Sequence, residues 1–443
     1  MAPTRNNDGL LARVNFPLYT LQMVTSRHIL VGGGGGSSKT GVANGFEIFE
    51  ISHNGETFVA EEAVRHETGP TVVMNSATYN DGKRTFLVAG QESHCQLYHV
   101  RLSVENEKRN SISSADQKEA QSNDNQTRQR KKRNSTSETS DKTSSNKSEK
   151  QKDKVTSNGV NKVQKRLHFE IKPSDSIQTD FSKEEPLQKV VRISRNGEIM
   201  VTGGTDGFIR VWQFPTMNKL LNIKAHTKEI DDLDICPDSA TIASISKDGA
   251  CCLWNSKTGK KTSTLTWEIP ANSKYLYKRC RFGIRGNGTD FDSLFTLANP
   301  VGRAGNLKSY LQMWEPASGK LRRNHAFDES LAALAVRDDG MFVAVGTMFS
   351  GSVSIHVAFS LQRIMNVRNA HGMFVTGLEF LPTSLDGPAI TCPYEAAVVS
   401  ISVDNRVCIH QVPFRQTMPV WLVLVLMVIL LCASFTVCSY FGL

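Results

Sequence analysis

Apolar and polar positions alternate along the chain in short stretches that predict β-strands. Seven of these stretches carry an apolar or aromatic residue at or near their end, after alternating positions. They are Phe46–Ile51, Cys95–Val100, Phe208–Phe214, Ala250–Ser256, Tyr310–Pro316, Ser352–Ala358 and Arg406–Val412. Alternation over four to eight residues is typical of a strand with one buried face. The pattern therefore predicts an all-β protein.

The stretches recur at a regular spacing. Trp212 and Trp254 are 42 residues apart, and so are Trp314 and His356. Several stretches follow a second short strand and a tight-turn sequence, such as SISKDG at Ser244–Gly249. Asp-Gly between alternating strands favours a two-residue hairpin. A period of about 40–45 residues with four strands per unit is typical of WD40 repeats, so we expect a seven-bladed WD40-type β-propeller.

A second pattern lies inside the repeats. In WD40 repeats a His, a Ser or Thr, an Asp and a Trp can form a hydrogen-bonded network. His226, Asp248 and Trp254 match that order together with Ser244 or Ser246, and we assign Ser246 to the network. Because the set follows the repeat period and no nucleophile elbow is present, we interpret it as structural rather than as a hydrolase triad.

The C-terminal region has a different character. After Arg415 the sequence contains no charged residue, and Val420–Tyr440 is almost continuously apolar. About 20 apolar residues in a helix span the hydrocarbon layer of a bilayer. A buried core helix is the alternative, but such helices rarely run so long without a charge. We predict a transmembrane helix over residues 419–440, with the large N-terminal part in the cytosol.

The composition changes abruptly over residues 103–165, where Ser, Asn, Gln and charged residues dominate. Such a segment buries too little apolar surface to offset its ordering entropy, so we predict a disordered insert. Its basic run Arg128–Arg133 is either a nucleic-acid patch or a solvated run near anionic lipid, and a membrane-anchored chain favours the second. The propeller is then assigned to residues 1–102 and 166–415.

The overall composition excludes several classes of protein. The chain has 443 residues, 39% of them hydrophobic, and a net charge of +9, which is inconsistent with a mini-protein, a collagen or a wholly disordered chain. Its nine cysteines are scattered and contain no C-x-x-C pair. The sequence therefore predicts neither a disulfide framework nor a zinc ribbon, and a reduced, cytosol-facing protein is the simpler interpretation.

Five consecutive glycines, Gly32–Gly36, follow an apolar strand. A phosphate-binding loop would need a glycine directly before Lys39, and Ser38 stands there instead. No helix pattern follows either, so we reject a nucleotide-binding loop. A flexible hairpin and a loop of unusual backbone shape both stay open. Glycines permit positive φ, which can turn several carbonyls towards one cation such as K⁺.

Several of these features occur together in one known family. They are the glycine hairpin GGGGGSSKTGVANG, the stretches AGQESHCQLY and PLQKVVRIS with GGTDGFIRVW, the stretch AHGMFVTGLEFLP and the apolar tail that begins PVWLVL. The chain resembles the prolactin regulatory element-binding protein family. This family is the animal form of the endoplasmic reticulum (ER) membrane exchange factors for the Sar small GTPase, which start COPII vesicle coat assembly.

The resemblance implies a cytosolic seven-bladed propeller, a single helix in the ER membrane and a glycine-rich loop that contacts the GTPase. On this chain the contact residues would be Gly34, Gly35, Gly36, Ser37, Ser38, Lys39, Thr40, Gly41 and Asn44. The resemblance also implies a bound potassium ion, held by Asn44 and by the carbonyls of Gly33, Gly34 and Gly35. COPII coat or exit-site proteins would be further partners, and nucleic acid is not expected.

The expected function is therefore guanine-nucleotide exchange, a regulation of a GTPase that needs no covalent chemistry. Two alternatives remain open at this point. A DNA-binding transcriptional regulator is favoured by the basic insert and a pI near 9.0, but the apolar tail and the lack of a DNA-binding helix motif argue against it. A membrane-anchored propeller scaffold, without effect on nucleotide exchange, is the other.

Overall fold

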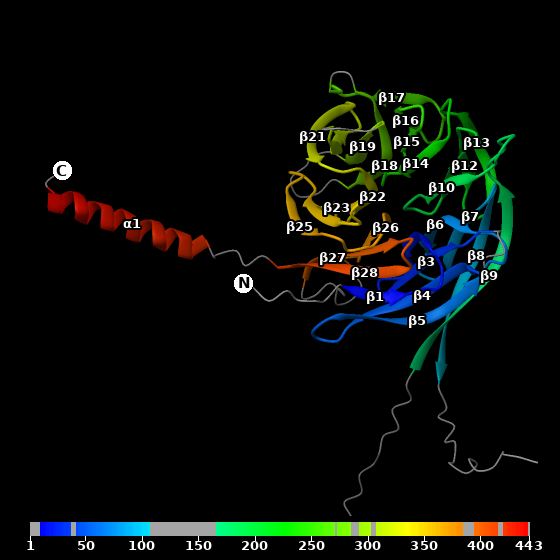
Figure 1. The fold of residues 1–443 in the computed structure, drawn as a ribbon, viewed down its shortest axis with the longest axis horizontal. Helices are drawn as coiled ribbons and strands as arrows, with labels where there is room; N and C mark the ends of the chain where they lie inside the picture. Colours follow the sequence, from blue (N-terminus) through cyan, green and yellow to red (C-terminus); the bar gives the residue numbers. More distant parts are fainter. Residues whose placement is uncertain are drawn as a thin grey trace, which may run out of the picture. The chain divides into compact units, whose positions relative to one another are not determined.

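The strands of this chain form a ring of small antiparallel sheets (Figure 1). The computed structural model describes residues 9–36, 41–106, 165–270, 273–284, 292–302, 307–383, 394–414 and 420–441. Within these residues there are seven sheets of four strands each. The first strands of neighbouring sheets contact one another in sequence, and the last of them, in the seventh sheet, contacts the first sheet again. The described residues thus form the predicted seven-bladed propeller.

Six blades consist of four consecutive strands. The first three blades are β2 (Leu18–Met23), β3 (His28–Gly34), β4 (Asn44–His53), β5 (Phe58–Glu67); β6 (Val73–Asn80), β7 (Thr85–Gln91), β8 (His94–Asn106), β9 (Lys165–Gln178); and β10 (Gln188–Ile193), β11 (Ile199–Gly204), β12 (Phe208–Gln213), β13 (Asn218–Lys224). The next three are β14 (Ile230–Ile235), β15 (Thr241–Ser246), β16 (Cys251–Asn255), β17 (Lys261–Leu265); β18 (Tyr275–Gly283), β19 (Ser293–Pro300), β20 (Ser309–Glu315), β21 (Lys320–Phe327); and β22 (Leu331–Val336), β23 (Phe342–Thr347), β24 (Val353–Val357), β25 (Arg363–Val367).

The seventh blade joins the two ends of the propeller sequence. It contains β26 (Val375–Phe380), β27 (Tyr394–Ser402) and β28 (Arg406–Pro413), and its outer strand is the N-terminal β1 (Leu10–Arg13). β1 pairs antiparallel with β28, with Leu10 opposite Cys408 and Arg13 opposite Arg406. The ring is therefore closed by strand pairing between segments about 400 residues apart.

The seven stretches predicted from alternation coincide with β4, β8, β12, β16, β20, β24 and β28. Each of these is the third strand of its blade. The third strand, like the second, lies between two hydrogen-bonded neighbours, and most of its side chains are buried. This burial accounts for the apolar residues of the seven stretches, and the predicted repeat is confirmed.

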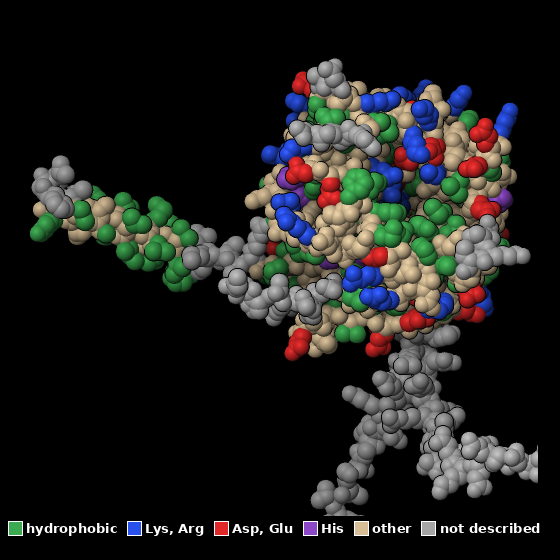
Figure 2. Space-filling view, viewed as in Figure 1, with side chains coloured by type: hydrophobic (Ala, Val, Ile, Leu, Met, Phe, Trp, Pro, Cys, Tyr) green, Lys and Arg blue, Asp and Glu red, His purple; other side chains and the backbone are tan. Residues whose placement is uncertain are grey.

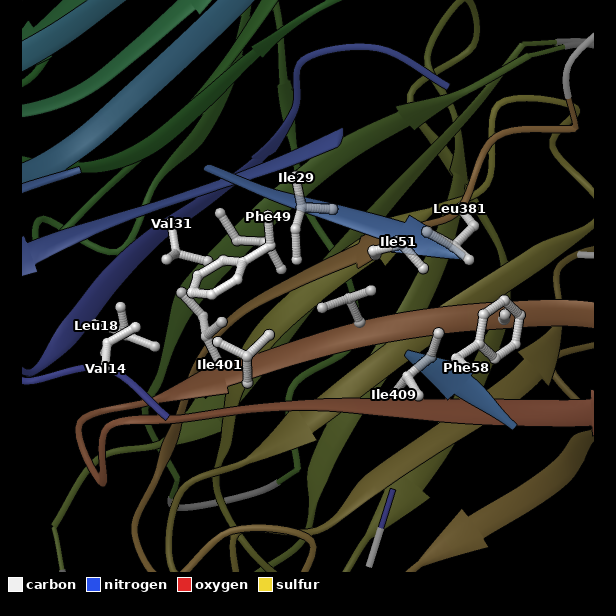
Figure 3. Close-up of a cluster of buried hydrophobic side chains, with 14 of the residues drawn as sticks. Val14, Leu18, Ile29, Val31, Phe49, Ile51, Phe58, Leu381, Ile401 and Ile409 are labelled. Carbon is white, nitrogen blue, oxygen red and sulfur yellow. The ribbon is translucent and has the colours of Figure 1, made fainter. Parts of the chain in front are cut away.

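A buried cluster joins the first and last blades across the closure (Figure 3). Leu18, Ile29 and Ile51 from the first blade are fully buried and pack with Ile401 of β27 and Val14, which follows β1. Fully burying an aliphatic side chain contributes about 1.5–3 kcal/mol. The cluster therefore supports the non-covalent closure and holds the strand that carries the glycines in place.

The structure describes one helix, α1 (Val420–Phe441), which contains no acidic residue in its first turn and no basic residue in its last. Among the described residues, no helix meets the length and apolarity needed for a membrane crossing, so the transmembrane segment predicted over 419–440 is not confirmed. Most of the predicted insert, residues 107–164, lies outside the described residues. β8 and β9 extend slightly into its predicted bounds.

Candidate functional site at the glycine hairpin

The five glycines lie where β3 ends and the connection to β4 begins. Gly33 is opposite Gly45 and Gly34 is opposite Asn44 in the β3–β4 pairing. A Cβ atom at Gly33 would lie 1.9 Å from the carbonyl oxygen of Pro17, so any side chain there would collide with the chain that enters β2. The backbone amide of Gly34 donates to the same carbonyl at 3.1 Å. These two glycines therefore serve close packing within the first blade.

The chain turns out of the strand at the next glycines. Gly34 has a φ of +144° and Gly36 a φ of +84°, which L-residues rarely adopt. A Cβ at Gly34 would lie 2.0 Å from the Asn44 side-chain oxygen, whereas a Cβ at Gly36 would meet no atom within 4 Å. At Gly34 a side chain would clash with Asn44 and would also disfavour the positive φ. At Gly36 only the positive φ requires a glycine.

Asn44 fixes the base of the hairpin. Its Oδ1 accepts a hydrogen bond from the backbone amide of Gly36 at 2.9 Å. Its Nδ2 donates to the carbonyl oxygen of Gly36 at 3.1 Å and to that of Gly69 at 2.9 Å. The side chain is only 5% exposed. Asn44 therefore ties the hairpin to the loop between β5 and β6, and two carbonyl oxygens converge on its amide nitrogen.

The structure describes part of the predicted contact loop. Gly34, Gly35, Gly36, Gly41 and Asn44 are described, and Gly41 has a positive φ of 76°. Ser37, Ser38, Lys39 and Thr40 lie outside the described residues. Sequence reasoning named Asn44 as part of this loop but did not find its partner Gly69, because no pattern in the sequence links the two loops.

In the fourth blade, His226, Asp248 and Trp254 form the predicted network with Ser244 rather than with the assigned Ser246. His226 Nδ1 lies 3.0 Å from Asp248 Oδ2, and His226 Nε2 lies 2.8 Å from the hydroxyl of Ser244. The indole of Trp254 donates to the same Ser244 hydroxyl at 2.9 Å. Desolvation lowers the pKa of His226, against the opposing effect of Asp248. His226, Ser244 and Trp254 are buried, Asp248 is half-buried, and hydrogen bonds link all four, as a structural role requires.

The assignment of Ser246 to this network is wrong. Its hydroxyl donates to the carbonyl of Lys228 and accepts from the amide of Asp248, so it shapes the tight turn. Residues two apart share a face of a strand, and alternation alone cannot separate them. They lie about 7 Å apart along the strand, however, and only Ser244 reaches Trp254.

A spacing of ten residues would have identified the correct serine. Thr202 accepts from the indole of Trp212 at 2.9 Å, and these residues are ten apart, like Ser244 and Trp254. In the seventh blade the Ser400 hydroxyl lies 2.8 Å from His410 Nε2, again at a separation of ten. The second and third strands are joined by similar turns in these blades, so the separation repeats.

Comparisons with known proteins agree with this architecture. The WD40 family (WD domain, G-beta repeat) matches residues 188–213 and 217–255, within the third and fourth blades. The mouse guanine nucleotide-exchange factor SEC12 is 34% identical over 425 residues, which cover 94% of both chains. The rat protein of the same name is 33% identical with the same coverage. The SEC12-like protein 2 of Arabidopsis thaliana is 26% identical over 49% of this chain and 50% of its own length.

The similarity to the mouse protein extends over 94% of both chains. It favours neither a DNA-binding regulator nor a plain scaffold. The chain belongs to the SEC12 family of guanine nucleotide-exchange factors, which is the prolactin regulatory element-binding protein family that the sequence indicated.

Proposed function

We propose that this protein is a guanine-nucleotide exchange factor for a Sar-type small GTPase at the ER membrane. The observation that carries the proposal is the similarity to the mouse exchange factor over 94% of both chains. Loading the GTPase with GTP would start COPII vesicle coat assembly and thereby ER-to-Golgi transport. COPII coat or exit-site proteins would be further partners of the same propeller.

The activity needs differential binding and no covalent chemistry. A protein that binds the empty GTPase more tightly than the GDP form weakens GDP binding by the same factor. Each tenfold loss of GDP affinity requires about 1.4 kcal/mol of differential contact. A rigid propeller can supply this energy by displacing the switch segments of the GTPase, which nucleotide and Mg²⁺ otherwise order.

The contact element of the proposal is the hairpin from Gly34 to Asn44. Its base is fixed by the hydrogen bonds of Asn44 to Gly36 and Gly69. A loop with a fixed base reaches the partner with little loss of conformational entropy, which leaves more of the contact energy for the exchange step. Lys39 and the neighbouring Ser37, Ser38 and Thr40 would lie at the loop's contact surface.

We also propose potassium as a ligand of this loop. Glycines at positive φ, such as Gly34 and Gly36, permit the backbone turns that a site lined by carbonyl oxygens requires. The carbonyls of Gly33, Gly34 and Gly35 would hold the ion. Asn44 fits the role of an orienting residue, because its oxygen already accepts from Gly36 and its nitrogen donates to two carbonyls. A bound cation would offset the repulsion between the carbonyl oxygens that hold it and so stabilise the loop.

A membrane anchor over residues 419–440 is part of the proposal. It rests on the uncharged sequence after Arg415 and on the 22 residues of α1. The topology would be single-pass, with the propeller in the cytosol. Anchoring would place new GTP-bound GTPase next to the membrane on which the coat assembles.

The test measures GDP release from a purified Sar-type GTPase with the full chain in detergent micelles. We expect strong acceleration in potassium buffer and a weaker effect in sodium buffer. Acceleration that does not depend on the cation would support the exchange activity but contradict the proposed potassium site. Equal affinity for the GDP-bound and the empty GTPase, with no acceleration, would identify a scaffold instead, since equal affinity shifts no equilibrium.

A further inference from the structure

The first strands of the blades surround a channel through the propeller. Its wall is formed by β2, β6, β10, β14, β18, β22 and β26. Figure 2 shows basic and apolar side chains gathered around a hollow in the face that is in view. At the end of the channel where these strands begin, a cavity of about 330 Å³ opens to solvent. This cavity is called the channel mouth below.

One side of the channel mouth is apolar. It is lined by Met74 from β6, Met348 from the β23–β24 turn and Phe374 directly before β26. Met74 is 37% exposed and Phe374 is 38% exposed. Phe349, the neighbour of Met348, is 76% exposed. Apolar side chains gathered at one opening, rather than scattered singly, are typical of an interaction site.

The other side of the channel mouth is basic. Lys189 from β10 and Lys278 and Arg279 from β18 line it, together with one carboxylate, that of Asp231 from β14. Glu229 forms ion pairs with Lys189 and Lys247, so its charge is shared between two cations. Within the described part of the chain, neither Lys278 nor Arg279 forms an ion pair with a carboxylate. Desolvation and then Arg279 lower the pKa of Lys278, and Asp231 opposes this shift only in part, so a further bound anion would raise that pKa.

The opposite end of the channel is bridged by the chain itself. Arg195, in the turn after β10, donates to the carbonyl oxygen of Asp338, in the turn after β22, at 3.3 Å. These turns belong to the third and sixth blades, which lie on different sides of the ring. The carboxylate of Asp338 in turn accepts from Thr383.

The channel mouth adjoins the glycine hairpin. Asn44 binds Gly69, which lies in the loop that leads into β6 and hence to Met74. On the other side, Gly33 is opposite Leu18, and the next residue, Tyr19, lines the channel mouth. A partner seated on the hairpin would thus lie next to the part of the channel mouth that Tyr19 and Met74 form.

We propose that the channel mouth is a second docking site for the GTPase, and that it receives a segment in which an apolar side chain stands next to acidic ones. The apolar side chain would pack on Met74 and Phe374, and the carboxylates would pair with Lys278 and Arg279. A protein segment fits better than a small anion, because the apolar surface extends beyond the cavity to Phe349. This inference rests on the proposed exchange function.

The test compares variants of the full chain by GDP release over a range of GTPase concentrations. The double variant Lys278→Gln/Arg279→Gln removes the unpaired cations, and Phe374→Ala removes the apolar wall. The control Lys219→Gln/Lys224→Gln removes the same charge from the outer strand β13, where both lysines are exposed. We expect a rise of about tenfold in the GTPase concentration for half-maximal rate in both site variants, and none in the control.

The maximal rate should change little, because the hairpin is intact in all variants. Unfolding temperatures equal to that of the parent chain would establish that the variants are folded. Folded variants with an unchanged half-maximal concentration would overturn the inference. Saturable binding of pyrophosphate that only the Lys278→Gln/Arg279→Gln variant loses, without a change in GTPase dependence, would assign the channel mouth to a small anion and also overturn it. Failure of the parent chain to accelerate GDP release would count against the exchange function itself.

Discussion

The Asn44 side chain both accepts a hydrogen bond from Gly36, at 2.9 Å, and donates one back to it, at 3.1 Å. Replacing Asn44 by Ala leaves the amide and carbonyl of Gly36 and the carbonyl of Gly69 without these partners. We expect a loss of about 2 kcal/mol in unfolding free energy, since unpaired buried polar groups are costly. GDP release should slow more than stability loss explains, because the loop loses its fixed base.

The matched control is Asn54→Ala in the turn between β4 and β5 of the same blade. The Asn54 side chain accepts from the amides of Glu56 and Thr57 and is exposed. This variant should retain the exchange rate. If both variants slow exchange equally, the effect would come from the blade as a whole rather than from the hairpin.

Two glycines of the first blade that have room for a Cβ atom allow the effect of backbone conformation to be tested without a steric clash. Gly36 and Gly55 have φ values of +84° and +102°, and a Cβ at either position would meet no atom within 4 Å. Each Gly→Ala substitution should cost about 1 kcal/mol of stability through the backbone alone. Only Gly36→Ala should slow GDP release. A Gly36→Ala variant with the rate of the parent chain would show that this part of the loop does not contact the GTPase.

The two serines of β15 provide a test of the repeat network. Both are fully buried, but Ser244 contacts His226 and Trp254, whereas Ser246 contacts only the backbone. We expect Ser244→Ala to lower the unfolding free energy by about 2 kcal/mol and Ser246→Ala by about 1 kcal/mol. Urea titration of both variants measures the difference. The reverse order would mean that the turn, rather than the network, stabilises the fourth blade.

Stability should fall in acid because of buried histidines. Burial, with a smaller effect of His371, lowers the pKa of His410 to about 3. The unfolded chain takes up a proton near pH 6.5, whereas the folded chain does so only near pH 3. The folded state is therefore favoured fully above pH 6.5, and this contribution is lost as the pH falls towards 3.

The measurement is the unfolding free energy of the parent chain and of His410→Gln between pH 7 and pH 4. The amide cannot take up the proton, so the variant should lose less stability over this range. His356→Gln tests the same effect in the sixth blade, where burial lowers the pKa to about 4. Parallel pH profiles for the parent chain and both variants would contradict this account.

The repeat was predictable because it depends on local alternation and on turns that recur at one period. The predicted stretches are all third strands, which are inner strands with a hydrogen-bonded neighbour on each side. The choice between Ser244 and Ser246 failed because alternation places both on one face of β15. The ten-residue separation shared by Thr202–Trp212 and Ser244–Trp254, rather than alternation, distinguishes the two serines. The link between Asn44 and Gly69 could not be predicted, because it joins two loops with no shared sequence pattern.

The pairing of β1 with β28 also has a mechanical consequence. β28 is the last strand before the C-terminal tail, and it is held on one side by β1 and on the other by β27. Tension applied through the tail at Phe414 would load both hydrogen-bonded ladders in shear, with many bonds resisting together. Deleting Leu10–Arg13 would turn β28 into a free edge, and the same pull would then act on a strand held from one side only.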